Sequence, residues 1–350
     1  MSRISLRVAG AAAGLSLIAA ACGSSSSSSG ASLPGATLNG SGSTFQKVFD
    51  QDQISAFTQA HTNVTINYAG GGSGKGRTDL ADQVVDFAGT DAPIAASDIG
   101  KYKGGTVLYF PTVVAPITVS YKLSGVTNLA LSADTLAKIF SRQIKTWDDP
   151  AIKADNPSLT LPSTNIVVVH RSDGSGTTQN FTLYLKKAAP SSWSLGSGST
   201  VNWPTDTQTG SGNPGVAQVI KATDGAIGYV DFADAQTAQL SFAGIKTSAG
   251  VVQPTLAGAS NALKGLTFNA DLTYDPINSP AAGAYPITAP TWIIVYKNQT
   301  DHNKGTVLKA FLTYVLTTGQ KNANQSSYAQ LPSDVAAKAL AQVNQIVVPA

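Results

Sequence analysis

Residues 69–77, AGGGSGKGR, combine glycines, a serine and a lysine as phosphate-binding loops do. A nucleotide P-loop requires a glycine six residues before its lysine and a Ser or Thr directly after it. Relative to Lys75, these positions hold Ala69 and Gly76. The hydroxyl that would bind Mg²⁺ is missing, so the stretch does not match a nucleotide loop. Its glycines and Ser73 still suit a backbone that binds an anion.

Three Gly/Ser clusters share one layout, because residues 40–45, 72–74 and 174–177 each precede an expected helix. A helix start offers unpaired backbone N–H groups and the positive end of the helix dipole. Three such starts, if they converge, form an anion site made of neutral donors. Taken singly, each Ser or Thr has an alternative role as a helix N-cap.

Two charged residues favour the anion site. Arg171 ends an apolar strand, at the kind of place where ligands bind in open α/β sheets, and its guanidinium can offer a bidentate fork to an oxyanion. An ion pair with Asp173 is the alternative, and both roles are compatible. Asp91 follows the expected strand 85–90. A carboxylate repels an anion that brings no proton, so Asp91 is either a helix cap or an element that selects protonated anions.

Strands and helices alternate along the part of the chain that carries these residues. Apolar patterning predicts strands at 64–70, 85–90 and 166–171, and helices at 134–144, 176–185, 214–222 and 305–316. This alternation predicts an α/β fold.

The amino-terminal segment has the features of an export signal. Residues 1–21 begin with Arg3 and Arg7 and continue as an apolar run, which predicts a signal peptide. The run ends before Cys22 in a pattern that resembles a bacterial lipobox, so Cys22 is the expected site of lipidation. Residues 24–29 are all serine, and we expect 22–32 to form a lipidated, flexible tether. A buried thiol after an ordinary signal peptide is the alternative for Cys22.

Composition excludes several functional classes. Charged residues make up 12% of the 350 residues, the net charge is +3, and no basic run indicates nucleic-acid binding. Three separated histidines and one cysteine give no metal-binding spacing, and we expect neither metal nor cofactor. The chain contains no G-x-S-x-G or S-x-x-K motif, so we expect no enzyme activity.

Seven motifs, in order along the chain, carry a family resemblance. They are GSGSTF, YAGGGSG, VDFAGTDAPI, IFSRQIKTWDDPAI, HRSDGSGTTQNF, GNPGVAQVIKATDGAIGYV and AYPITAPTWIIVYK. From about residue 36 onward, the chain resembles the phosphate-binding protein of the bacterial high-affinity phosphate ABC transporter.

The resemblance implies a set of phosphate ligands in this sequence. The backbone N–H groups of Thr44 and Phe45, the Thr44 hydroxyl and Ser73 would donate to the anion. Asp91 would accept the phosphate proton, and Arg171, braced by Asp173, would supply the charged fork. The remaining implied ligands are at a helix start: Ser175, Gly176 and Thr177. Position 43 is Ser where the family often has Ala, which removes no ligand.

The resemblance also implies the fold and its division. The expected fold is the α/β periplasmic-binding-protein type II fold, in which two α/β lobes joined by a two-segment hinge hold the ligand in a cleft. We expect lobe 1 at 33–114 and 240–350 and lobe 2 at 115–239. The first hinge crossing is expected near 113–116 and the return within 232–250.

The implied function is extracytoplasmic, high-affinity binding of inorganic phosphate and its delivery to membrane permease subunits. The expected protein is a monomer held by its lipid anchor on the outer face of the cell membrane. Two alternatives stay open: a binding protein for another tetrahedral oxyanion, such as sulfate or molybdate, and a surface phosphate sensor or adhesin on the same fold.

Overall fold

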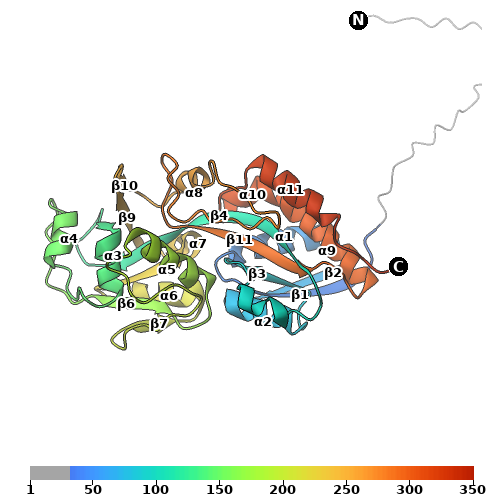
Figure 1. The fold of residues 1–350 in the computed structure, drawn as a ribbon, viewed down its shortest axis with the longest axis horizontal. Coiled ribbons are helices and arrows are strands. Elements are labelled where there is room, and N and C mark those ends of the chain that lie inside the picture. Colours follow the sequence, from blue (N-terminus) through green and yellow to red (C-terminus); the bar gives the residue numbers. More distant parts are fainter. Residues whose placement is uncertain (1–31) are drawn as a thin grey trace, which may run out of the picture. The chain divides into compact units, whose positions relative to one another are not determined.

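The computed structural model describes residues 32–350, and residues 33–350 form one compact unit. The predicted signal peptide, Cys22 and the serine tract lie outside the described residues. Strands and helices alternate through this unit, so the predicted α/β class is confirmed (Figure 1). Within the described part of the chain, no helix combines the length and apolar character needed to cross a bilayer.

Eleven strands are present in the described chain. They are β1 (Ala36–Gly42), β2 (Val64–Ala69), β3 (Phe87–Thr90), β4 (Val107–Lys122), β5 (Ala130–Ser132), β6 (Val167–Arg171), β7 (Gln208–Gly210), β8 (Ala226–Asp231), β9 (Ser241–Thr247), β10 (Gly250–Val252) and β11 (Thr288–Tyr296).

The helices of the described chain follow most of these strands. They are α1 (Lys47–Ala60), α2 (Ser73–Ala81), α3 (Ala133–Phe140), α4 (Pro150–Asp155), α5 (Gly176–Ala188), α6 (Gly212–Ala222), α7 (Phe232–Thr237), α8 (Leu256–Ala262), α9 (His302–Tyr314), α10 (Gln320–Asn322) and α11 (Ser333–Val343). Short 3₁₀ segments lie at Ala96–Lys101 and Ala323–Ser326, and a π-helical segment lies at Val315–Gly319.

One group of strands has the order β2-β1-β3-β11-β4. The first three are parallel, whereas β11 runs antiparallel to both β3 and β4. Helix α2 packs on β1 and β3, and α9 packs on β1. Figure 1 shows α2 on one side of this sheet and α9 to α11 on the other.

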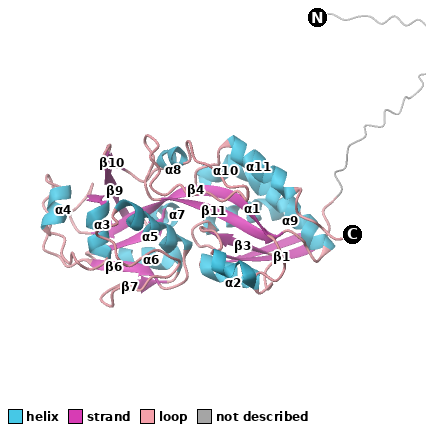
Figure 2. Ribbon diagram, viewed as in Figure 1, coloured by secondary structure: helices cyan, strands magenta, loops and turns pink. Residues whose placement is uncertain are grey.

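The long strand β4 continues into a second group of strands. Its first half pairs with β11, up to Pro116 opposite Thr288, and its second half pairs with β8, starting at Ile117 opposite Asp231. Beyond β8 the order continues β6-β7, and β9 joins β4 to β5 and β10. Helices flank strands in both groups (Figure 2). The chain therefore passes between the two sheets in mid-strand, at Pro116–Ile117.

A second passage returns the chain to the first sheet. Strand β9 pairs with residues 119–121 of β4 and with β5, and β10 pairs only with β9. The next element, α8, contributes Ala259, and the residue after it, Leu263, joins the same buried cluster with Val114 and Trp292 of the first sheet. Residues 241–252 thus complete the second group of strands before the chain passes to α8.

Candidate functional site

The carboxyl ends of strands from the two sheets face each other beside the middle of β4. Thr90, which ends β3, pairs with Trp292, and Trp292 pairs with Pro111 of β4. Asp231, which ends β8, pairs with Ile117 of the same strand. Strand β1 is parallel to β3, and β6 is parallel to β8, so both end at these same edges. The loops that follow β1 and β6 therefore meet.

The structure brings the predicted site residues together from both sides of this junction. Gly74 donates its N–H to the carbonyl of Gly174 over 2.8 Å, which joins the start of α2 to the loop after β6. At Gly176 an added Cβ would lie 2.6 Å from both Asp91 Cβ and Ser73 Oγ. This approach leaves no room for a side chain, which explains why the first residue of α5 is a glycine.

Two serine hydroxyls hold the Asp91 carboxylate, which is 1% exposed. Ser43 donates its hydroxyl in a short hydrogen bond to Asp91 Oδ1, and Ser73 donates to Asp91 Oδ2 over 3.2 Å. Burial raises the pKa of Asp91 to about 6, although hydrogen bonds from Ser43 and the charge of Arg171 oppose the rise. Asp91 therefore titrates close to the pH range in which phosphate itself changes charge.

Arg171 is fixed by an ion pair. Its side chain is 1% exposed, its Nε donates to Asp173 Oδ1 over 2.8 Å, and its Nη2 donates to Asp173 Oδ2. Gly212 N–H also donates to Asp173 over 3.0 Å. Burial alone would raise the pKa of Asp173, but the hydrogen bond and charge of Arg171 outweigh it and lower the pKa. The remaining guanidinium nitrogen, Nη1, points to Thr177 Oγ1 at 3.3 Å.

The start of α5 presents N–H groups toward the junction. The Ser175 side chain caps the helix by accepting from Thr178 N–H at 3.1 Å, and Ser175 N–H donates to the carbonyl of Ser199. The N–H groups of Gly176 and Thr177 have no acceptor within residues 32–350. These two groups lie at the positive end of the helix dipole and are the donors that an anion would meet.

The loop after β1 differs in one detail from what the resemblance implied. Thr44 N–H has no acceptor among the described residues, but Phe45 N–H donates to Ser43 Oγ over 3.0 Å. The Phe45 ring is fully buried beside Tyr328. Phe45 therefore anchors the loop through its side chain, and its N–H is engaged by Ser43 in this structure.

Two further residues of the site were missed by the sequence reasoning. The sequence indicates no binding role for Ser43, which differs from the alanine common in the family, but its hydroxyl donates to Asp91. Asn213, at the start of α6, is fully buried and donates to both Thr44 Oγ1 and Thr177 Oγ1. The signal for Asn213 was present in the motif GNPGV, in which a glycine and an amide precede an apolar helix.

The two cations of the stretch 69–77, Lys75 and Arg77, pair with residues outside the candidate anion site. Lys75 pairs with Asp79 at 2.7 Å and is half exposed. Arg77 donates to Thr90 Oγ1, in the residue before Asp91, at 2.9 Å. Burial lowers the pKa of Arg77. Ser73 is therefore the residue of this loop that belongs to the site.

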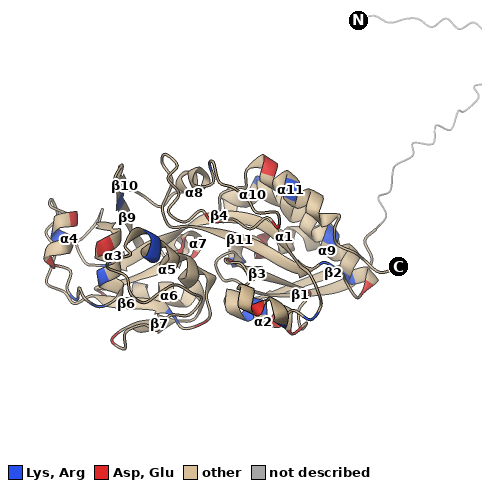
Figure 3. Cartoon of the chain, viewed as in Figure 1, with Lys and Arg blue, Asp and Glu red and all other residues tan. Residues whose placement is uncertain are grey.

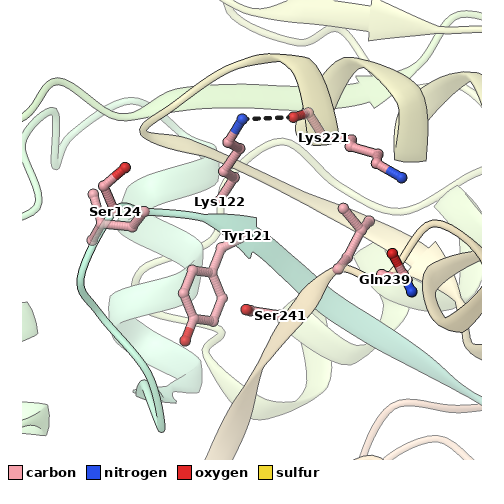
Figure 4. Close-up of a pocket in the computed structure, with 8 residues that line it drawn as sticks. Tyr121, Lys122, Ser124, Lys221, Gln239 and Ser241 are labelled. Atoms are coloured by element: carbon pink, nitrogen blue, oxygen red, sulfur yellow. Dashed lines mark hydrogen bonds between the residues drawn. The ribbon is translucent and has the colours of Figure 1, made fainter.

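Other surfaces of the described chain carry no comparable group of converging polar side chains. Figure 3 shows Lys, Arg and Asp scattered over its elements, without a continuous basic stripe. No group of three or more His, Cys, Asp or Glu residues could hold a metal ion within residues 32–350. A surface pocket lined by Tyr121, Lys122 and Gln239 lies at the far end of β4, and its Lys122 Nζ donates to the Lys221 carbonyl (Figure 4). That pocket contains none of the predicted site residues.

The fold and the site together define the class of protein. The model of the PBP superfamily domain matches residues 26–318. The chain is 38% identical to the phosphate-binding protein PstS of Methanocaldococcus jannaschii, over 87% of this chain and 85% of the relative. It is 36% identical to the phosphate-binding protein PstS 3 of Mycobacterium tuberculosis, over 89% and 86% of the two chains. The chain belongs to the family of PstS phosphate-binding proteins within this superfamily.

Solved structures agree at the level of the fold. A high-affinity periplasmic phosphate-binding protein, solved with bound phosphate, superposes with a TM-score of 0.73 at 22% identity, covering 90% of this chain and all of its own. A phosphate-binding protein from Stenotrophomonas maltophilia gives 0.70 at 19% identity, covering 87% and 93%. The predicted periplasmic-binding-protein fold is confirmed.

Proposed function

We propose that this chain captures inorganic phosphate outside the cytoplasmic membrane and delivers it to the permease subunits of a phosphate ABC transporter. The observation that carries the proposal is a buried acid, Asp91, set among unpaired N–H donors from two sheets. Such a site accepts the proton of an anion and donates to its bare oxygens at the same time. Membership of the PstS family supports this ligand.

The proposed ligands are the residues expected from the sequence, and two further residues support them without binding the anion. Donors on the side of the first sheet are Thr44 and the backbone N–H of Ser73, whose hydroxyl is engaged by Asp91. Phe45 N–H joins them if Ser43 Oγ releases it. Donors around α5 are Ser175, Gly176 and Thr177, and Arg171 supplies the positive charge through Nη1. A charge-assisted hydrogen bond contributes about 1.5–3 kcal/mol, so several neutral donors can hold a dianion without a cluster of lysines. Ser43 and Asn213 act through Asp91 and the threonines.

Asp91 favours phosphate over sulfate or molybdate, which are ligands of the first alternative. Sulfate has the shape of phosphate but carries no proton at neutral pH. Bound next to an ionised Asp91, it would place two negative charges face to face in a site closed to water. Phosphate avoids this cost because its own proton lies between a phosphate oxygen and an oxygen of Asp91.

We also propose how the chain is organised around this function. Lobe 1 comprises residues 33–116 and 253–350, lobe 2 comprises 117–252, and the two hinge segments are the middle of β4 and residues 253–255. Phosphate then binds between the lobes and holds them closed. A lipid on Cys22 keeps the monomer on the membrane, and the chain releases its ligand chemically unchanged. A further role as a surface sensor or adhesin is compatible with the same binding step.

Calorimetric titration of the full-length chain, stripped of anion, tests the proposal. We expect tight binding of phosphate and much weaker binding of sulfate. Asp91→Asn should gain sulfate affinity by roughly tenfold or more, about 1.4 kcal/mol, because the amide no longer repels the anion. Asp301→Asn is the matched control, since Asn also caps a helix and Asp301 caps α9 away from the site.

Three outcomes separate the parts of the proposal. Absence of phosphate binding by the wild-type chain would remove the function. Phosphate binding with unchanged sulfate rejection in Asp91→Asn would leave the function and remove the role given to Asp91. Release of phosphate from a phosphomonoester by the purified chain would show an activity that the proposal excludes.

A further inference from the structure

The two threonine hydroxyls of the site differ from the hydroxyls of Ser43 and Ser73 in how they are used. Ser43 donates to Asp91 Oδ1, and Ser73 donates to Asp91 Oδ2, so their protons are engaged by the carboxylate. Thr44 Oγ1 and Thr177 Oγ1 act only as acceptors within residues 32–350. Their protons therefore have no protein acceptor in the described chain.

One residue, Asn213, lies between these two hydroxyls. Its side-chain nitrogen Nδ2 is 3.2 Å from Thr44 Oγ1 and 3.1 Å from Thr177 Oγ1. Its backbone N–H also donates to Thr44 Oγ1, over 3.1 Å. An amide nitrogen carries two hydrogens, so the Asn213 side chain supplies one to each threonine.

The orientation of this amide is fixed from behind. Asn213 Oδ1 accepts the backbone N–H of Asp231 at 3.3 Å, so the oxygen faces the end of β8 and the nitrogen faces the threonines. Asn213 is fully buried, and so are Thr177 and Asp231, so water does not compete for these bonds. A flipped amide would leave the Asp231 N–H without its acceptor and turn an oxygen toward both hydroxyls.

Counting lone pairs gives the consequence. A hydroxyl oxygen accepts two hydrogen bonds and donates one. Thr44 Oγ1 receives two from Asn213, and Thr177 Oγ1 receives one from Asn213 and one from Arg171 Nη1 at 3.3 Å. With both lone pairs engaged, each threonine can only donate to whatever else approaches it.

We infer that Asn213 is a positioning residue that sets the Thr44 and Thr177 hydroxyls as donors toward the bound anion. Without it, each hydroxyl could turn a lone pair to the anion and repel it. The inference rests on the proposed phosphate function and adds a residue to it. Because Thr44 follows β1 and Asn213 follows β7, the same bonds also join the two sheets around the ligand.

A double-mutant design tests this role in the full-length chain. Asn213→Ala should weaken phosphate binding roughly 10- to 100-fold, because two donors lose their fixed direction. In a chain that carries Thr44→Val and Thr177→Val, the same change should weaken binding less than about threefold, since no hydroxyl remains to be oriented. The matched background is Thr44→Ser with Thr177→Ser, which keeps both hydroxyls and should keep the full effect of Asn213→Ala.

The outcomes are distinguishable. An equal loss in the valine and serine backgrounds would overturn the inference, because Asn213 would then act through packing or sheet contact alone. Failure of the wild-type chain to bind phosphate would overturn the proposed function and this inference with it. Thermal unfolding checks that each variant folds, and if Asn213→Ala does not, the same cycle with Asn213→Ser decides the question.

Discussion

At the scale of single residues, the Asp91 carboxylate depends on its serines. Ser43 and Ser73 each donate to a different oxygen of Asp91, and both bonds stabilise the charged form. Burial acts in the opposite direction and raises the pKa of Asp91 to about 6. Small changes around this carboxylate should therefore alter which anions the site accepts.

Ser43→Ala should raise the pKa of Asp91 further, because it removes a hydrogen bond that favours the carboxylate. A larger fraction of Asp91 is then protonated near neutral pH, and sulfate rejection should weaken by roughly three- to tenfold, about 0.7–1.4 kcal/mol. Competition titration with phosphate and sulfate measures the ratio of affinities. Ser41→Ala is the control, since Ser41 Oγ donates to Asp79 instead. An unchanged ratio in Ser43→Ala would contradict the prediction.

The pH dependence of sulfate binding has a definite sign. At a pH below its pKa of about 6, Asp91 is protonated and can donate to an oxyanion. At a higher pH the carboxylate repels an oxyanion that carries no proton. Sulfate affinity should therefore rise by about tenfold in total as pH falls from 7 to 5, because the protonated fraction of Asp91 grows by that factor. Titrations at several pH values should show this rise for wild type. Asp91→Asn should show no such rise, and a matching rise in that variant would assign the effect to another group.

At the scale of elements, α1 carries a buried polar face. Gln46, Asp50 and Gln53 are each at most 2% exposed, and Gln46 Nε2 donates to Asp50 Oδ2 over 2.9 Å. The second oxygen of Asp50 has no partner in the described chain. Burial, aided by the charge of Asp91 and opposed by the Gln46 hydrogen bond, raises the pKa of Asp50 to about 7.

This raised pKa predicts how the stability of the anion-free chain changes with pH. The folded chain holds a proton on Asp50 up to a higher pH than the unfolded chain, whose carboxyl has a pKa near 3.8. The contribution of Asp50 to stability is therefore complete below pH 4 and is lost as pH rises toward 7. Asp50→Asn resembles the protonated acid, so its free energy of unfolding relative to wild type should rise with pH. The slope should be at most about 1.4 kcal/mol per pH unit.

Urea unfolding of both anion-free chains at pH 5 and pH 8 measures this difference. The Asp301→Asn variant should run parallel to wild type, because Asp301 is exposed at the start of α9. A constant difference between Asp50→Asn and wild type over this range would mean that Asp50 is already ionised in the folded chain.

The start of α5 separates helix formation from ligand binding. Alanine forms helices better than glycine by up to about 1 kcal/mol, so Gly176→Ala suits the helix itself. Its Cβ would, however, lie 2.6 Å from Asp91 Cβ and Ser73 Oγ, and it would push the two sheets apart. We expect phosphate affinity to fall roughly 100-fold, about 2.7 kcal/mol, without loss of the folded state.

Calorimetry and thermal unfolding together check this prediction. Gly100→Ala is a suitable control, because an added Cβ at Gly100 meets nothing within 4 Å. Retention of wild-type affinity by Gly176→Ala would show that the approach of α5 to Asp91 is not needed for binding.

At the scale of the whole unit 33–350, several hydrogen bonds join the two sheets beyond the site. Asn180 Nδ2 donates to the Asp91 carbonyl at 2.7 Å, and Lys187 Nζ pairs with Asp275 at 2.6 Å. Asn180 and Lys187 lie on α5, and Asp275 belongs to the segment between α8 and β11. Helix α5 thus contacts loop segments on the side of the first sheet, and we call this the closed arrangement.

Phosphate should favour this closed arrangement over a more open one in solution. Small-angle X-ray scattering should give a smaller radius of gyration with phosphate than without it. Free phosphate at 100 times Kd should stabilise the fold by about 2.7 kcal/mol. Lys187→Met should speed phosphate release at most about fivefold, since half-exposed ion pairs contribute about 0.2–1 kcal/mol. Lys101→Met, which removes an exposed ion pair with Asp98 inside the 3₁₀ segment Ala96–Lys101, should not change release. Equal scattering with and without phosphate would contradict closure.

Local sequence patterns are sufficient to predict the α/β class, the strand-end positions of Asp91 and Arg171, and the helix starts near Ser73 and Gly176. These features are local, since they follow from apolar periodicity and from the backbone needs of Gly and Ser. Because the motifs fall in family order, the resemblance also implies the set of candidate phosphate ligands.

Tertiary structure alone decided how those residues use their hydrogen bonds. The hydroxyl of Ser43 is turned to Asp91, and Asn213 reaches Thr44 from 169 positions away in the chain. The passage of the chain after Val252 likewise depends on the pairing of β9 with β4 and β5. No periodicity encodes such contacts, because a polar side chain finds its partner only after distant strands are paired and water is excluded from between them.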